Sequence, residues 1–246
     1  MKKITTLIIL TFFIQTIAHS QSCLPEGIIF SNQSEIDNFQ VNNLNCTEIE
    51  GDVIISGENI KNLNGLNVLT SVNGKFNIEY NDSLFSLTGL EALTHIGGHF
   101  VIEYNNNLTN LLGLASLSSI GGDFELRRNA SLINTVGLNS LTNIAETFTV
   151  YKNNNLNDFS GLNSLVEIGG YLYVYFNPVL LSLAGLDNVL SVGGIIIYNN
   201  NILPTLTGLN SVHSVQEDVY IYYNDSLTNI TSLVSITSIN GKLWVH

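Results

Sequence analysis

Residues 75–98 read KFNIEYNDSLFSLTGLEALTHIGG, and variants of this unit recur eight times between about residue 52 and the end of the chain. If the unit is numbered from its lysine, apolar residues occupy positions 2, 4, 10, 13, 16, 19 and 22, and an Asn stands at position 7. A Gly-Leu pair at positions 15 and 16 is the most regular mark of the unit. A fixed period of this length indicates a repeat protein, in which each unit buries its apolar side only against its neighbours.

The apolar spacing within the unit favours strands over a helix. Five apolar positions spaced by three would spread around a helix, because each step slips by about 60°, and a glycine interrupts every run. The front of the unit alternates as a strand does, with Phe76 and Ile78 apolar and Asn77 and Glu79 polar. The sequence therefore predicts an all-β fold, a right-handed parallel β-solenoid or β-helix. About nine leucine-rich coils would form a rod roughly 40 Å long.

The asparagine at position 7 follows the first strand, where the chain must turn. It is found as Asn81, Asn105, Asn129, Asn153, Asn177 and Asn224. An Asn side chain tolerates left-handed backbone geometry and bonds nearby backbone groups, so stacked copies can form a ladder. We expect these asparagines to be structural.

The chain before the repeats has two parts. Residues 1–20 combine two lysines, a short apolar stretch and a small-residue exit, which is typical of a secretory signal peptide. No later segment is apolar enough to hold the protein in a membrane, so we expect a secreted or cell-surface location. Residues 21–51 are expected to form an N-terminal cap and a degenerate first coil, with Ile29, Phe39, Cys46 and Ile49 pointing inward. The repeats then fill residues 52–246, and the last coil is incomplete.

The only two cysteines, Cys23 and Cys46, lie in this cap region. In an oxidising compartment a pair of cysteines favours a disulfide, and no His or further Cys lies nearby to complete a metal site. We predict that they bond and fasten the cap over the first coil.

The net charge of −12 disfavours nucleic acid as a partner, since nucleic-acid recognition needs a basic surface. Charged residues make up only 11 % of the chain, and their pattern implies neither a metal site nor a cofactor. Acidic corner residues such as Asp82 and Asp225 lack the cluster of carboxylates that a calcium loop requires.

Three segments resemble the beginning of a receptor L domain, the leucine-rich β-helical module of insulin- and EGF-type receptors. They are CLPEGIIF from Cys23, IDNF from Ile36 and NCTEIEGDVII from Asn45. The units that follow are similar to elongated versions of this module in secreted surface proteins of bacteria and fungi. The resemblance implies an extracellular recognition or adhesion module, without the transmembrane helix or kinase of the receptors.

Aromatic residues gather on the outward positions 3, 5 and 6 of the first strand. The candidate ligand-binding residues are Tyr80, Tyr104, Tyr151, Tyr173, Tyr175, Phe176, Tyr220, Tyr222, Tyr223 and Trp244. Stacked coils would bring them to one sheet face, where an exposed aromatic patch marks a protein or glycan site. The alternative is a structural ladder in which neighbouring rings stabilise the sheet. In that case the protein is a passive spacer of a longer surface protein.

An enzyme is the third interpretation, because some β-helices cleave polysaccharides. Glu79 and Glu103 occupy equal positions of adjacent units, and paired carboxylates are what glycoside hydrolysis requires. Coil stacking aligns any two equal positions, however, and the histidines form no triad by spacing. We therefore expect no catalytic residues.

The printed sequence stops at Lys242-Leu-Trp-Val-His246, the first strand of a further coil. An uncovered solenoid edge invites pairing with other strands, so edge-to-edge association is one expectation, and a longer anchored protein is the other. Seven Asn-x-Ser/Thr sequons also occur, several of them on the corner asparagine, where a glycan would conflict with the ladder.

Overall fold

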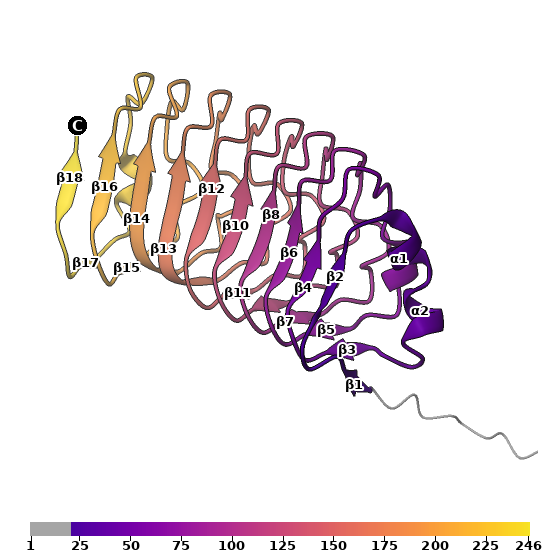
Figure 1. Cartoon of the computed structure of the whole chain (residues 1–246). Helices are drawn as coiled ribbons and strands as arrows, with labels where there is room; N and C mark the ends of the chain where they lie inside the picture. The colour runs from indigo at the N-terminus through magenta and orange to yellow at the C-terminus, as the bar shows by residue number, and fades with distance from the viewer. Residues whose placement is uncertain (1–20) are drawn as a thin grey trace, which may run out of the picture.

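The protein is a parallel β-solenoid, as the repeat predicts. A computed structural model describes residues 21–246, and the expected signal peptide at residues 1–20 lies outside the described residues. Successive coils stack side by side along one axis, from the cap helices at one end to β18 at the other (Figure 1). Among residues 21–246, no helix is long and apolar enough to cross a bilayer.

Two parallel sheets run along the rod, and both are built from strands that pair between neighbouring coils. The long sheet contains β2 (Ile28–Phe30), β4 (Val53–Ile55), β6 (Phe76–Glu79), β8 (Phe100–Glu103), β10 (Phe124–Arg127), β12 (Phe148–Tyr151), β13 (Glu167–Tyr175), β14 (Ser191–Tyr198), β16 (Val219–Tyr222) and β18 (Leu243–Val245). The short sheet contains β1 (Ser22–Cys23), β3 (Glu48–Ile49), β5 (Ser71–Val72), β7 (His95–Ile96), β9 (Ser119–Ile120), β11 (Asn143–Ile144), β15 (Ser214–Val215) and β17 (Ser238–Ile239). The strands β13 and β14 bend through both sheets and join them.

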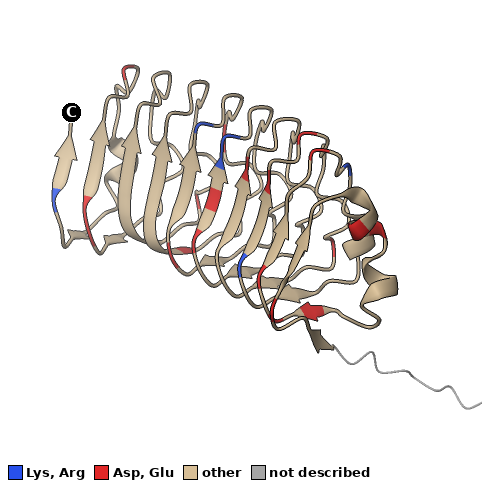
Figure 2. Ribbon diagram, viewed as in Figure 1, with Lys and Arg blue, Asp and Glu red and all other residues tan. Residues whose placement is uncertain are grey.

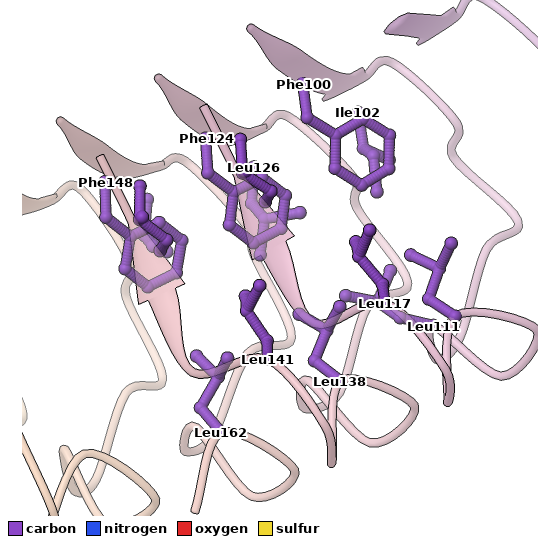
Figure 3. Close-up of a cluster of buried hydrophobic side chains, with 14 of the residues drawn as sticks. Phe100, Ile102, Leu111, Leu117, Phe124, Leu126, Leu138, Leu141, Phe148 and Leu162 are labelled. Carbon is purple, nitrogen blue, oxygen red and sulfur yellow. The ribbon is translucent and has the colours of Figure 1, made fainter. Parts of the chain in front are cut away.

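The interior consists of columns of identical or similar side chains. Phe100, Phe124 and Phe148 are register partners whose rings stack with centroids 5.3 and 5.0 Å apart. Leucine columns from the later positions of the unit close the other side of the core (Figure 3). The apolar positions expected to point inward are fully buried throughout the central coils. Because every coil offers the same shape to the next, one continuous core fills the rod.

The asparagine ladder is present and buried. The side chain of Asn129 donates to the Ile102 carbonyl at 2.8 Å, and its own oxygen accepts the backbone N–H of Asn105 at 3.1 Å. The same pattern runs from Asn81 to Asn224. It includes Asn200, which the sequence analysis missed because its unit is one residue shorter. Since the side chains of Asn81 and Asn129 are fully buried, their sequons offer no accessible amide to a glycan.

The left-handed residue at this corner is not the asparagine but the residue before it. Its φ lies between +52° and +57° in seven successive coils, at Tyr80, Tyr104, Arg128, Lys152, Phe176, Asn199 and Tyr223. Bulky side chains rarely adopt this conformation, so stacking between coils overrides local preference here. The expectation that the asparagine itself takes the left-handed conformation was wrong, because the residue before it does so.

The regular recurrence of the glycine in the Gly-Leu pair has a steric cause. Gly113 has a φ of +113°, and a Cβ placed on it would lie 2.1 Å from the carbonyl oxygen of Leu87 in the preceding coil. Gly89 and Gly137 meet the same restriction. A side chain at this position would force adjacent coils apart.

The N-terminal coil is closed by two short helices, α1 (Gln33–Asp37) and α2 (Phe39–Asn42). Both helices pack against the 3₁₀ turn η1 (Asn64–Leu66), whose counterpart in the last coil is η2 (Thr231–Leu233). The predicted disulfide joins Cys23 to Cys46, with Cα atoms 5.6 Å apart.

Of the four residues of this first coil expected to point inward, Phe39, Cys46 and Ile49 are buried. Ile29 is 62 % exposed, so that expectation was wrong for Ile29. Phe30, the next residue of β2, takes the buried place.

Candidate functional site

The outward face of the long sheet carries a continuous stack of aromatic rings. Tyr151, Tyr175, Tyr198 and Tyr222 follow one another at position 5, with centroid distances of 4.5, 4.9 and 4.9 Å. Trp244 extends the stack, because its ring lies 5.5 Å from that of Tyr222. We call these five residues the aromatic stack. Sequence analysis missed Tyr198, whose place becomes clear once its unit is aligned on Asn200.

Stacking determines which parts of these rings are accessible. The faces of the inner rings lie against one another, so the stack turns its edges and hydroxyl groups outward. Burial raises the pKa of the Tyr198 hydroxyl to about 12, and neighbouring Tyr175 and Tyr222 add to the shift. The inner rings therefore serve partly as the cross-strand ladder that was the alternative interpretation.

A second, shorter stack lies nearer the N-terminus and is linked to the first by an arginine. The rings of Tyr80 and Tyr104 stack at 4.9 Å. The Arg128 guanidinium lies 5.0 Å from the ring centroid of Tyr104 and 4.9 Å from that of Tyr151. One nitrogen of Arg128 also donates to Glu103 at 2.7 Å. Cation–π contacts on both sides and this charged hydrogen bond fix the guanidinium in place.

Four aromatic residues protrude from the face, and two of them, Tyr80 and Trp244, are end members of the stacks. Tyr80 is 53 % exposed, Phe176 46 %, Tyr223 59 % and Trp244 51 %. The rings of Tyr223 and Tyr222 are nearly perpendicular, as are those of Phe176 and Tyr198.

The two remaining candidates, Tyr173 and Tyr220, are half-buried on β13 and β16. All ten candidates thus lie on the long sheet or at the corner where its strands end. Some of them are stacked and some protrude, and Tyr80 and Trp244 do both.

Charged residues occupy the middle of the same face. Glu79 and Glu103 are register partners on β6 and β8, as coil stacking predicts. Burial, and after it the charge of Glu103, raises the pKa of Glu79 above its usual range. Arg127 pairs with Glu125 on β10. Coil stacking by itself accounts for the Glu79–Glu103 pair, and Arg128 forms an ion pair with Glu103.

Residues 45–136 match the family model of the receptor L domain. This type of module is extracellular and recognises ligands without catalysis. No curated protein matches the chain, and no solved structure matches it. The matched segment contains Tyr80 and Tyr104, whereas the aromatic stack from Tyr151 onward follows it in the chain.

Among residues 21–246, one group of side chains has the composition of a metal site. Potential ligand atoms of His99, Asp123 and Glu146 lie within 4.8 Å of one another. Nδ1 of His99 accepts the backbone N–H of Asp123 at 2.9 Å, and the Asp123 carboxylate accepts that of Thr147 at 2.9 Å. The carboxylates of Asp52 and Asp218 accept a backbone N–H of the next coil in the same way, so the side chain at position 1 links neighbouring coils by a hydrogen bond.

Proposed function

We propose that the protein is an extracellular recognition module that binds a protein partner through the aromatic face of its long sheet. The observation that carries this proposal is the gathering of exposed rings on one side of the rod, with Tyr223 and Trp244 both more than half exposed. Contiguous exposed aromatic surface is typical of an interaction site, and tyrosine and tryptophan are enriched where protein interfaces gain most of their energy.

The geometry of the aromatic stack favours a polypeptide over a sugar as its ligand. A sugar ring packs its apolar C–H face across an open aromatic face, and the inner rings of the aromatic stack have no open face. Their outward edges and hydroxyl groups suit the irregular mixture of apolar and polar groups that a protein surface presents. The proposal includes export by a signal peptide at residues 1–20, in keeping with the extracellular nature of receptor L domains.

The repeat itself supplies matched substitutions for a test. Asn199 already occupies the left-handed corner position of Tyr223, and Thr149 occupies the strand position of Tyr220. The double variant Tyr220→Thr/Tyr223→Asn therefore removes two rings with residues that the coil is known to accept. Tyr198→Ser is the control, because it interrupts the stack and leaves Tyr220 and Tyr223 in place.

The mature protein and both variants would be tested against an array of extracellular proteins, with thermal unfolding measured in parallel. We expect the double variant to lose at least tenfold in affinity for any specific partner while keeping its stability. Tyr198→Ser should lose stability and retain more of its binding. Full retention of binding by the double variant would refute the proposal. Stability losses without any protein binding would favour the passive spacer.

A further inference from the structure

A groove runs along the corner where the strands of the long sheet end. Its first hollow, of about 230 Å³, is lined by Tyr104, Arg128, Lys152 and Asn154 among others. A second hollow, of about 290 Å³, is lined by Lys152, Asn154, Phe176, Asn199 and Asn201 with Pro178. Because Lys152 and Asn154 belong to both, the two hollows form one depression, which we call the corner groove. From the coil of Tyr104 to that of Asn199 it spans about 19 Å along the rod.

The corner groove concentrates positive charge on an acidic protein. Residues 21–246 contain six Lys and Arg residues, and two of them, Arg128 and Lys152, line the groove. Arg127 precedes Arg128 at the end of β10, and Figure 2 shows basic residues gathered near the ends of β10 and β12. Arg127 is paired with Glu125, and Arg128 with Glu103. In the described part of the chain no carboxylate lies within 4.0 Å of the Lys152 ammonium group, and its side chain is exposed. The groove therefore has an uncompensated cation at its centre.

Arg128 is held ready for an anion. Two aromatic rings and Glu103 fix its guanidinium group, so an incoming ligand would not have to order it. A guanidinium group has five N–H donors in a rigid plane, and the bond to Glu103 leaves further donors for a second acidic group. Pre-ordered side chains of this kind bind with a lower entropic cost.

The remainder of the lining is amide and aromatic. Asn154 and Asn201 are exposed and offer both donors and acceptors, while Phe176 offers apolar surface beside them. This combination satisfies the hydroxyl groups and the apolar C–H surface of a sugar chain. The long-sheet strands beneath are paired on both sides, so no free strand edge is present here for an extended peptide.

We propose that the corner groove binds an anionic polysaccharide, whose carboxylate or sulfate groups contact Arg128 and Lys152. The chain would lie along the rod axis, with its sugar rings over Phe176 and the amides of Asn154 and Asn201. This inference goes beyond the proposed function, because Lys152 and its neighbours are not needed for a protein to bind at Tyr220 and Tyr223.

The test uses isothermal titration calorimetry on the chain from residue 21 onward at 50 mM NaCl. The probes are an oligogalacturonate hexamer, a heparin-derived hexasaccharide, neutral cellohexaose and a hexaglutamate peptide. The two anionic saccharides separate carboxylate from sulfate recognition. We expect one of them to bind, with affinity falling at least tenfold in 200 mM NaCl.

Lys152→Gln is the decisive variant, and Lys75→Gln is its control, since both lysines are exposed and both changes remove one positive charge. We expect Lys152→Gln to weaken binding at least tenfold and Lys75→Gln less than twofold. Arg128→Lys, which keeps the charge and loses the planar donors, should also weaken binding.

Equal affinity of the wild type and Lys152→Gln would overturn the proposal, as would equal binding of cellohexaose or of neither anionic saccharide. Equal or tighter binding of hexaglutamate would reject a glycan in favour of an acidic peptide. Each of these outcomes leaves the effect of Tyr220→Thr/Tyr223→Asn on protein binding unchanged, so the two proposals fail separately.

Discussion

Replacing Asn129 by Ala tests whether the buried asparagine ladder holds the coils together. The substitution leaves the Ile102 carbonyl without its 2.8 Å donor and the backbone N–H of Asn105 without its 3.1 Å acceptor. Both groups lie where water has no access, since the side chains of Asn105 and Asn129 are fully buried. The Ile102 carbonyl lies in the paired strands β8 and β10, so we count only the Asn105 N–H as unsatisfied. An unsatisfied buried polar group costs about 1–3 kcal/mol, so the free energy of unfolding should fall by about 1–3 kcal/mol.

The measurement is equilibrium denaturation in urea, followed by far-ultraviolet circular dichroism, with Asn155→Ala as the control. Asn155 lies on the surface of the next coil, and we expect its replacement to change stability by less than about 0.5 kcal/mol. Repeat proteins can unfold in segments, so hydrogen exchange at the Asn105 amide gives a local readout. A loss below about 1 kcal/mol together with unchanged protection of this amide would refute the ladder as a stabilising element.

Three further predictions concern other contacts between coils. Gly194→Ala should destabilise the rod, because its Cβ would lie 2.1 Å from the ring of Tyr171, whose hydroxyl donates to Glu217 at 2.6 Å. That hydrogen bond raises the pKa of Tyr171 to about 12, so spectrophotometric titration should show this pKa falling toward 10 in the variant, and an unmoved titration would contradict the contact. Because the pKa of Tyr198 is raised in the folded protein, the unfolded chain loses the Tyr198 hydroxyl proton at a lower pH. The stability that the neutral hydroxyl contributes should therefore be present below pH 10 and lost as the pH rises toward 12. In denaturation curves measured from pH 9 to 12, Tyr198→Phe should make the free energy of unfolding fall less steeply with pH. The same dependence on pH in the variant and the wild type would contradict this prediction. Reduction of the Cys23–Cys46 disulfide, which closes a separation of 23 residues, should lower stability by about 3 kcal/mol in denaturation with and without reductant. An unchanged midpoint would show that the cap holds without its covalent link.

Periodicity explains why so much of the fold could be predicted from the sequence. The apolar columns, the parallel pairing and the Asn ladder all follow from one rule, that equal positions of successive units stack. The rule fails where the unit changes length or loses its pattern. Tyr198 and Asn200 were missed in a unit one residue shorter, and Ile29 was misplaced in a first coil that has no repeat to align with.

The binding face was less predictable because ring orientation is a tertiary property. Alternation indicates that Tyr175 points outward, but not that both of its faces are covered by Tyr151 and Tyr198. Residue preference assigns the left-handed turn to the asparagine, whereas the coils impose it on residues as bulky as Phe176. The corner groove could not be predicted for the same reason, because Arg128 and Lys152 belong to different coils and line one hollow only in the folded solenoid.

The register of the coils has an evolutionary consequence. Phe76, Phe100 and Phe124 are direct partners, so each coil presents its successor with the surface that it received from its predecessor. Deleting or duplicating a stretch of one period, for example residues 99–122, would bring together junctions that the molecule already contains. Unequal recombination between such units can therefore shorten or extend the reach of the protein without inventing a new interface.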